Sequence, residues 1–286
     1  MAVYKRTYKG YSGAITAEWQ RFTVIPRFAW EGLFQQRFLT ILFVLCFFYP
    51  LGCALFLYLN HNLQSLLGAV VNVGVNRLQV GNEFFFLYTN VQCTLAFILT
   101  AFIGPGLISS DLANNALPLY FCRPISRVEY VAGKAIVIAG LLSLITWIPG
   151  LLLFGLQASL ADGWLAENGW IAGAIIGSSI LWILVITMLS LALSAWVRWR
   201  IVAGALMMVI LSFGAGVAQA VKSVTNSTAG FWFDIASNSE RIWMDLYRID
   251  HSETFSTEEA ITAILLCTAL CVYMLAKKVR AYEVVK

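Results

Sequence analysis

Charged side chains of both signs are grouped in one stretch of this sequence, residues 104–134, which lies between two long apolar segments. Side chains of this kind beside an apolar segment can anchor a loop against lipid headgroups or against a neighbouring chain. They are Asp111, Arg123, Arg127, Glu129 and Lys134. A loop that only returned the chain would not need such a set, so we interpret the stretch as functional.

The first part of this stretch predicts a short helix. Asp111 follows the helix-breaking Gly-Pro-Gly of residues 104–106, and Leu112, Ala116 and Leu119 then repeat with the spacing of one helix face. This pattern predicts a short amphipathic helix that lies across the end of a membrane span.

The second part predicts a turn and a new helix. Arg123 precedes Pro124, which pushes its backbone towards an extended conformation. Ser126 and Glu129 fit the capping box S-x-x-E, in which each side chain binds a backbone N–H beside the other residue. A helix is therefore expected to begin here and to run into the next apolar segment.

The sequence lacks the motifs of the common nucleotide-binding and hydrolytic enzymes. Gly133-Lys134 is followed by Ala135 and has no upstream glycine at P-loop spacing, so the chain cannot cradle ATP phosphates in that way. No G-x-S-x-G or H-E-x-x-H motif occurs. Cys267 and Cys271 share a helix face, but two thiols without further ligands favour packing over metal binding. We therefore expect no enzymatic activity, no cofactor and no metal site in this chain.

The composition is that of a membrane protein. Hydrophobic residues make up 60% of the 286 residues and charged residues only 12%, whereas a typical soluble domain has about 25% charged residues. Six windows without Asp, Glu, Lys or Arg are long enough for a spanning helix of roughly 20 residues. We place the spans at 38–59, 86–108, 135–157, 171–196, 201–221 and 260–277. The expected fold is an all-α polytopic membrane protein with one domain over residues 1–286, comprising an N-terminal segment (1–37), a six-span core (38–277) and a tail (278–286).

The basic residues are distributed unequally between the two sides of these spans. With the N-terminus inside, fifteen of the 19 Lys and Arg residues lie on the cytoplasmic side, which satisfies the positive-inside rule. Both termini and the stretch 104–134 are therefore predicted to be cytoplasmic. The alternating aromatic and basic residues within 1–37 predict an interfacial helix that leads into the first span. The net charge of +4 does not indicate nucleic acid, because the basic residues lie beside membrane segments.

Several residue types in the stretch 104–134 also occur in the order typical of one transporter family. An acidic residue is followed by N-x-A-L-x-L-Y, then R-P-I-S-R, E-Y and G-K. This run resembles the permeases of ABC type-2 transporters, and the rest of the chain agrees in hydropathy and number of spans. The resemblance implies the permease subunit of an ATP-driven exporter in a bacterial or archaeal cytoplasmic membrane. Separate ABC ATPase subunits would bind the ATP, and a second permease subunit, identical or different, would complete the transporter.

The resemblance also implies roles for individual residues, because in this family the loop between the second and third spans carries a coupling helix that docks into the ATPase. The residues expected to contribute to coupling are Asp111, Leu112, Asn115, Leu117, Tyr120 and Phe121. Those expected to fix the loop against headgroups or the neighbouring chain are Arg123, Arg127, Glu129 and Lys134. Members of the family also place short re-entrant helices between their last two spans. An ordinary aromatic belt is the alternative for the aromatic residues of 222–259.

Two features within the spans predict local geometry. Gly169, Gly173 and Gly177 repeat at every fourth residue, which predicts a close contact with another helix. Pro149 in the third span, and Gly214 and Gly216 near the end of the fifth, predict bends.

Two other functional classes are alternatives to the exporter. A membrane-embedded enzyme would need polar catalytic groups deep in its spans, and the six windows contain no charged residue. The same absence argues against a proton- or sodium-driven carrier. A non-transporting scaffold subunit that recruits an ATPase complex would keep the docking loop and stays open. The sequence does not identify a substrate.

Overall fold

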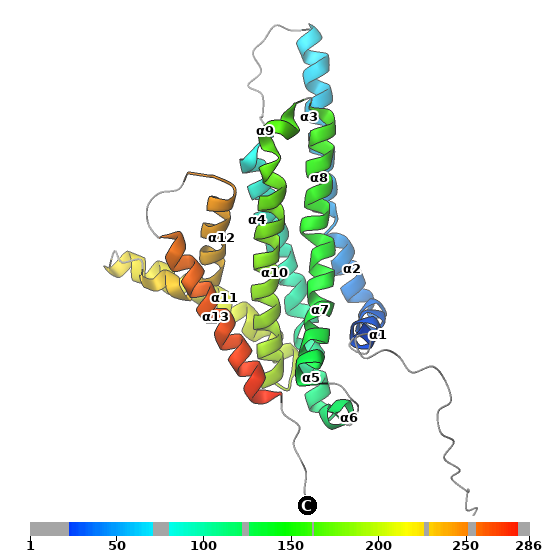
Figure 1. The fold of residues 1–286 in the computed structure, drawn as a ribbon, viewed down its shortest axis with the longest axis vertical. Coiled ribbons are helices and arrows are strands. Elements are labelled where there is room, and N and C mark those ends of the chain that lie inside the picture. The colour runs from blue at the N-terminus through cyan, green and yellow to red at the C-terminus, as the bar shows by residue number, and fades with distance from the viewer. Residues whose placement is uncertain are drawn as a thin grey trace, which may run out of the picture.

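The computed structural model describes residues 23–70, 80–121, 126–161, 163–225, 229–250 and 256–279, and every regular element within these ranges is a helix (Figure 1). Six stretches are long and apolar enough to cross a bilayer. They are Arg37–Asn62, Asn82–Ala113, Arg127–Leu160, Trp170–Trp196, Arg200–Thr225 and Thr257–Lys278. The predicted all-α fold with six candidate spans is therefore confirmed. Residues 1–22 of the predicted N-terminal segment and 280–286 of the predicted tail lie outside the described residues.

The fourth span, α10 (Trp170–Trp196), forms the centre of the bundle (Figure 1). It contacts α4 (Asn82–Ile103), α7 (Arg127–Ile145), α11 (Arg200–Thr225) and α13 (Thr257–Lys278). Its buried surface includes many serine and alanine side chains. Small side chains let neighbouring helices approach closely, which suits a helix that is surrounded on most sides.

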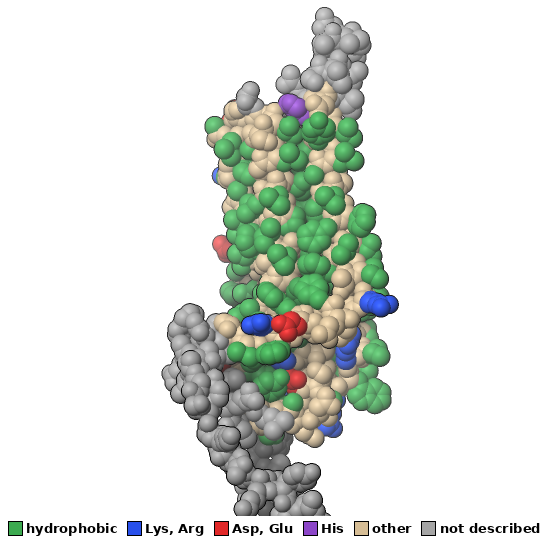
Figure 2. Space-filling view, turned by 90° about the vertical axis from the view of Figure 1, so that its right-hand side faces the viewer, with side chains coloured by type: hydrophobic (Ala, Val, Ile, Leu, Met, Phe, Trp, Pro, Cys, Tyr) green, Lys and Arg blue, Asp and Glu red, His purple; other side chains and the backbone are tan. Residues whose placement is uncertain are grey.

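The two ends of the bundle differ in charge. Arg127, Arg198, Arg200, Lys277 and Lys278 lie at or beside the ends of spans on one side, which we call the basic end; the opposite side is called the far end. On the face drawn in Figure 2, hydrophobic side chains cover most of the described surface, and the charged side chains gather mainly towards the lower end. Which side of a membrane each end faces stays a prediction.

Three of the six spans are built from two consecutive helices with a break between them. The helix pairs are α2 (Arg37–Leu45) with α3 (Phe48–Val70), α4 with α5 (Pro105–Ala113), and α7 with α8 (Trp147–Leu160). In each pair a proline lies in the first turn of the second helix, where its missing N–H does no harm. These are Pro50, Pro105 and Pro149. The predicted break at Pro149 is confirmed, whereas α11 runs unbroken through Gly214.

Gln92, in the middle of α4, binds backbone groups that two of these prolines leave without a helical partner. A proline frees the carbonyl group four residues before it, which here belongs to Cys46 and to Ile145. The Gln92 Nε2 atom donates to both carbonyl oxygens, at 3.0 Å and 2.6 Å. Because Gln92 is only 1% exposed, these bonds join the first and third spans to the second inside the bundle.

The N-terminal helix α1 (Val24–Phe34) packs against α7. Trp30 donates from its Nε1 atom to the carbonyl oxygen of Val137 at 3.1 Å. A Cβ atom on Gly140 would lie 2.6 Å from the Trp30 ring, so this contact requires glycine. A helix is therefore present in the predicted N-terminal segment, while its location at the membrane interface stays a prediction.

The segment after the fifth span folds back along it. The 3-10 helix η2 (Ala229–Phe233) lies so close to α11 that a Cβ atom on Gly214 would be 2.4 Å from the carbonyl oxygen of Phe233. Gly214 lies near the middle of α11, so η2 reaches about halfway along the span. Glycine is needed here for the close approach of two backbones rather than for a bend.

The chain then reverses and returns to the far end. The Asp234 carboxylate caps α12 (Ile235–Leu246) by accepting bonds from two backbone N–H groups of its first turn. After α12, the Tyr247 carbonyl oxygen accepts a bond from Asn82 Nδ2, at the start of α4, at 2.9 Å. Together η2 and α12 form a hairpin that folds back beside the fifth candidate span, which is the geometry expected of re-entrant helices.

Of the three glycines predicted to contact another helix closely, only Gly169 has a backbone atom close to it, the carbonyl oxygen of Leu165 four residues earlier in the chain, among the described residues. A Cβ atom on Gly173 would meet nothing within 4 Å, and one on Gly177 would lie 3.6 Å from a methyl group of Leu246. The tight contact that the spacing predicts is therefore not made within the part of the chain that the structure describes.

Candidate functional site

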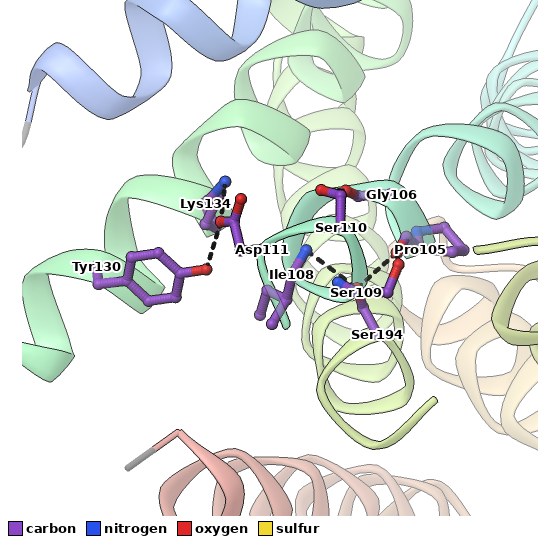
Figure 3. Close-up of polar contacts among 9 residues, drawn as sticks. All are labelled: Pro105, Gly106, Ile108, Ser109, Ser110, Asp111, Tyr130, Lys134 and Ser194. Atoms are coloured by element: carbon purple, nitrogen blue, oxygen red, sulfur yellow. Dashed lines mark hydrogen bonds and ion pairs between the residues drawn. The ribbon is translucent and has the colours of Figure 1, made fainter. Parts of the chain in front are cut away.

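Two of the five charged residues of the stretch 104–134, Asp111 and Lys134, form a buried ion pair (Figure 3). Lys134 Nζ lies 2.8 Å from Asp111 Oδ2, and the Tyr130 hydroxyl donates to the same oxygen at 2.7 Å. The side chains of Lys134 and Asp111 are 8% and 15% exposed, so little water reaches the pair. Asp111 is in the last turn of α5 and Lys134 is near the start of α7. The pair therefore joins the ends of the second and third spans.

Two tyrosine rings lie close to the Lys134 ammonium group. Its nitrogen is 5.6 Å from the centre of the Tyr130 ring and 6.0 Å from that of Tyr120, and the ring centres are 5.3 Å apart. Attraction between a cation and an aromatic ring is strongest where water is excluded. Tyr120 belongs to the short helix α6 (Leu117–Phe121), so these contacts also hold α6 against α7. We call Asp111, Tyr120, Tyr130 and Lys134 the loop cluster.

Asn115 sets the turn between α5 and α6. Its φ of 52° is in the left-handed region, which Asn tolerates better than most side chains do. The Ala116 N–H donates to the Asp111 carbonyl at 2.8 Å and the Asn115 N–H to the Leu112 carbonyl at 3.3 Å. These are the two bonds of a Schellman turn. The backbone of Asp111 is thus fixed by the same turn that directs the chain into α6.

The structure corrects two details of the predicted loop. The second span continues beyond its predicted end at residue 108, because α5, which Pro105 opens after the predicted break at Gly-Pro-Gly, runs to Ala113. The expected single short helix is wrong, because the turn at Asn115 places Leu112 on α5 and Leu119 on α6. The regular spacing of these two leucines therefore does not indicate that they share one helix face.

Ser194 of α10 holds α5 in place. Its hydroxyl accepts bonds from the backbone N–H groups of Ile108 and Ser109 at 3.1 Å and 2.9 Å, and donates to the Pro105 carbonyl at 2.7 Å (Figure 3). Ser194 is fully buried. The helix that carries Asp111 is therefore hydrogen-bonded directly to the central span.

The predicted capping box is present at the start of α7. Ser126 Oγ accepts a bond from the Glu129 N–H at 3.2 Å, and Glu129 Oε2 accepts one from the Ser126 N–H at 2.6 Å. This box fixes the first turn of α7 and, with it, the positions of Tyr130 and Lys134. Glu129 therefore acts within its own chain as a helix cap.

The residues predicted to couple to an ATPase divide into buried and exposed ones. Leu117 is 6% exposed and Leu112 is half-buried, so both pack within this chain. Asp111 and Tyr120 belong to the loop cluster. Asn115 is exposed, as is Pro118, which was not predicted. The side chain of Phe121 lies outside the described residues.

The residues predicted to anchor the loop also differ in their surroundings. Lys134 was expected to reach headgroups or a neighbouring chain, but it is buried against Asp111 of its own chain because the end of α5 packs beside α7. Arg127 is exposed and makes no ion pair with the described residues. Arg123 lies outside the described residues.

Sequence reasoning missed two members of this site, Tyr130 and Ser194. Tyr130 precedes Lys134 by four residues, and this spacing places both on one helix face; that signal was available. Ser194 lies in an apolar window with several other serines. Nothing in the sequence distinguishes it from them.

A second polar group lies at the hairpin. Asp234 is 3% exposed, and Glu240 Oε1 accepts a bond from Asn90 Nδ2 at 3.4 Å. The Nε and Nη1 atoms of Arg241 are buried, and no described residue forms a hydrogen bond with them. Burial, together with the nearby Asp234 carboxylate, raises the pKa of Glu240, which lies outside the six candidate spans. We call Asn90, Asp234, Glu240 and Arg241 the hairpin polar residues.

Neither polar region resembles a metal centre. In the described ranges, no group of three or more His, Cys, Asp or Glu side chains could hold a metal ion.

Comparison with models of known protein families gave no match for this chain, and comparison with curated proteins gave none either.

Proposed function

We propose that this chain is the permease subunit of an ABC type-2 exporter that moves its substrate with energy from separate ATPase subunits. The observation that carries the proposal is the loop cluster, where a buried ion pair joins the second and third spans directly beside the short helix α6. In this proposal the basic end faces the cytoplasm and the ATPases, and a second permease subunit completes the transporter.

The loop cluster supplies a mechanical link between α6 and the spans. A force on α6 would displace Tyr120, which packs against Tyr130 with 5.3 Å between ring centres. Tyr130 and Lys134 both bind Asp111, so the displacement would reach α5 and α7 together. The bonds of Ser194 would pass it on to α10. ATP and cargo need not touch the loop for this link to operate.

The exposed part of the loop is the proposed docking surface. Asn115 and Pro118 are exposed on the turn and on α6, while Leu117 packs inward behind them. A substitution at Leu117 would therefore test folding, whereas one at Pro118 tests docking. The re-entrant hairpin between the last two spans is a second feature that favours this class of exporter.

The experiment that tests the proposal replaces Pro118 by Asp. The variant should insert at normal levels, because the side chain is exposed and an acidic residue is well tolerated in the first turn of a helix. Binding of the ATPase should weaken by on the order of 1–3 kcal/mol if Pro118 is an anchor of the interface. Co-purification of the two subunits measures the binding, and ATP turnover in reconstituted membranes measures the coupling.

Val224→Asp is the matched control, because Val224 is 82% exposed at the far end of α11. The control should leave ATPase binding unchanged. Equal ATPase binding by wild type and Pro118→Asp would contradict docking at this loop. Transport by the reconstituted wild-type complex separates the exporter from a scaffold subunit, which would bind the ATPase but move no substrate.

A further inference from the structure

An apolar groove runs along the outside of the bundle between α7 and α13. Its volume is about 460 Å³. The described residues that line it come from the first turns of α7, the last turns of α13 and one position of α10. They are Arg127, Val128, Val131, Ala132, Ala135, Met188, Val272, Leu275, Ala276 and Val279. The groove therefore begins at the basic end and lies on the surface of two candidate spans.

The groove extends far enough along the spans to hold part of a lipid acyl chain and not only a headgroup. Met188 precedes the end of α10 at Trp196 by eight residues, which is about 12 Å of helix at 1.5 Å per residue. The groove thus extends well along the apolar part of the spans. Val272 and Leu275 line it on the α13 side and Val131 and Ala135 on the α7 side.

The mouth of the groove is basic. Arg127 is the only charged residue among its described lining residues, and its guanidinium makes no ion pair with the described part of the chain. Lys277 and Lys278 follow directly after the lining residue Ala276. The acidic residue nearest in sequence, Glu129, uses its carboxylate in the capping box. Within the described ranges, no carboxylate therefore forms an ion pair with this guanidinium at the end of a span.

We infer that this groove binds an anionic phospholipid from the leaflet at the basic end, with one acyl chain in the groove and the phosphate group on Arg127. Basic pockets between spanning helices at the cytoplasmic side are suited to anionic headgroups, and the planar guanidinium matches phosphate oxygens in geometry. The apolar walls match the acyl chain of the same molecule. The inference requires only a bilayer and does not depend on the proposed exporter function.

A second copy of this chain fits the groove less well than a lipid does. Contact across a two-fold axis brings the same patch of both subunits together. The partner's copy of the groove would then offer no acidic lining residue to Arg127, because Arg127 is the only charged residue among the described lining residues. The charge at the mouth therefore favours an anionic lipid.

Bound in this way, the lipid would connect the third span to the sixth. The lining residue Ala135 follows Lys134 of the loop cluster directly in α7, and the α13 wall is at the end of the last span. Occupation of the groove would stabilise the packing of α13 against the bundle.

The test uses the purified full chain, delipidated and returned to nanodiscs of phosphatidylcholine with or without phosphatidylglycerol. Retention of each lipid after transfer to detergent is measured by native mass spectrometry. The wild type should retain phosphatidylglycerol in preference to phosphatidylcholine. In Arg127→Gln, the retention of phosphatidylglycerol relative to phosphatidylcholine should fall about fivefold, since a basic residue near anionic lipid contributes roughly 1 kcal/mol. Arg127→Lys should keep most of it.

Two further variants make the result specific. Arg198→Gln removes one exposed charge at the basic end that does not line the groove, and it should retain lipid as the wild type does. Ala132→Phe fills the groove while leaving Arg127 in place, and it should reduce retention of both lipids.

Four outcomes would overturn the inference. Arg127→Gln could retain phosphatidylglycerol as the wild type does, or Arg198→Gln could lose it equally. Glycerol 3-phosphate could displace the phosphatidylglycerol, which would identify a site for a free phosphate ester. Ala132→Phe could dissociate an oligomer without changing lipid retention, which would identify the groove as an interface between copies.

Discussion

The loop cluster and the hairpin polar residues both place charged groups in buried settings, but in the described part of the chain only the loop cluster contains an ion pair. Asp111 and Lys134 lie 2.8 Å apart at the basic end. At the hairpin, two nitrogen atoms of Arg241 have no hydrogen-bond partner among the described residues, and the bond from Asn90 to Glu240 is long at 3.4 Å. Separating a buried pair exposes two uncompensated charges to a low-dielectric environment. The comparison therefore indicates that the basic end resists local displacement more strongly than the hairpin does.

Both regions end a helix with the same kind of turn. Asn115 and Arg248 each have φ of 52°, and each turn has the two bonds of a Schellman motif. The difference is in the side chain at the left-handed position. Asn115 is a residue that tolerates this conformation, whereas the Arg248 guanidinium lies 4.4 Å from the centre of the Trp170 ring. Arg248, which suits the left-handed conformation less well than Asn115 does, is therefore the residue whose side chain makes a contact with another helix.

The largest expected effect follows from removal of one member of the buried pair. Lys134→Met should lower the free energy of unfolding by roughly 3–5 kcal/mol, because the Asp111 carboxylate is then buried without a counter-charge. Denaturant unfolding of the purified chain in detergent, followed by tryptophan fluorescence, measures the change. The double variant Asp111→Leu with Lys134→Met removes both charges and should recover most of the loss.

Arg198→Met is the control for this prediction, because Arg198 is an exposed cation at the same end of the bundle. Its effect should stay within about 0.5 kcal/mol, as for most surface substitutions. A loss in Lys134→Met no greater than in Arg198→Met would show that the pair does not stabilise the basic end.

An intermediate effect is expected at the two left-handed positions. Asn115→Val should destabilise the chain by roughly 1–2 kcal/mol, because a β-branched side chain clashes with the backbone in this conformation. Asn115→Gly should be close to neutral. Arg248→Gly should also change stability little, because relief of the backbone is offset by loss of a cation–ring contact of roughly 0.5–1 kcal/mol. Thermal unfolding of the three variants ranks them, and equal stability of Asn115→Val and Asn115→Gly would contradict the assigned turn.

The smallest effect concerns Glu240. A pKa raised above the ordinary carboxyl range means that the folded state holds the proton more tightly than the unfolded state. Stability should therefore fall as the pH rises from the ordinary carboxyl range through the raised pKa. Glu240→Gln removes this titration, so it should be at least as stable as the wild type at neutral pH and should flatten the dependence of Tm on pH. A neutral-pH loss in this variant would show that the ionised carboxylate is stabilising.

Features that depend on neighbouring residues in the sequence could be predicted, and those that depend on packing could not. The six spans follow from long apolar windows, and the Ser126–Glu129 box follows from a local motif. The partner of Asp111 could not be predicted, because Lys134 is 23 residues away and meets it only where α5 and α7 pack together.

The hairpin shows a further limit of reasoning from hydropathy. The charge-free windows predicted spans without acidic groups, yet folding of η2 and α12 back into the bundle brings Asp234 and Glu240 beside those spans. Likewise, Pro50 and Pro149 predict free carbonyl groups by local geometry, but their shared partner Gln92 is fixed by tertiary structure.

The central claim is that the loop cluster transmits movement from α6 to the spans, and its most direct test is ATP turnover by a complex that carries Asp111→Leu and Lys134→Met together. The exposed surface at Asn115 and Pro118 is unchanged in this variant, so the ATPase subunits should still co-purify with the permease. Permease-stimulated turnover in reconstituted membranes should fall towards the rate of the ATPase subunits by themselves. Wild-type turnover by a complex that assembles normally would contradict the account.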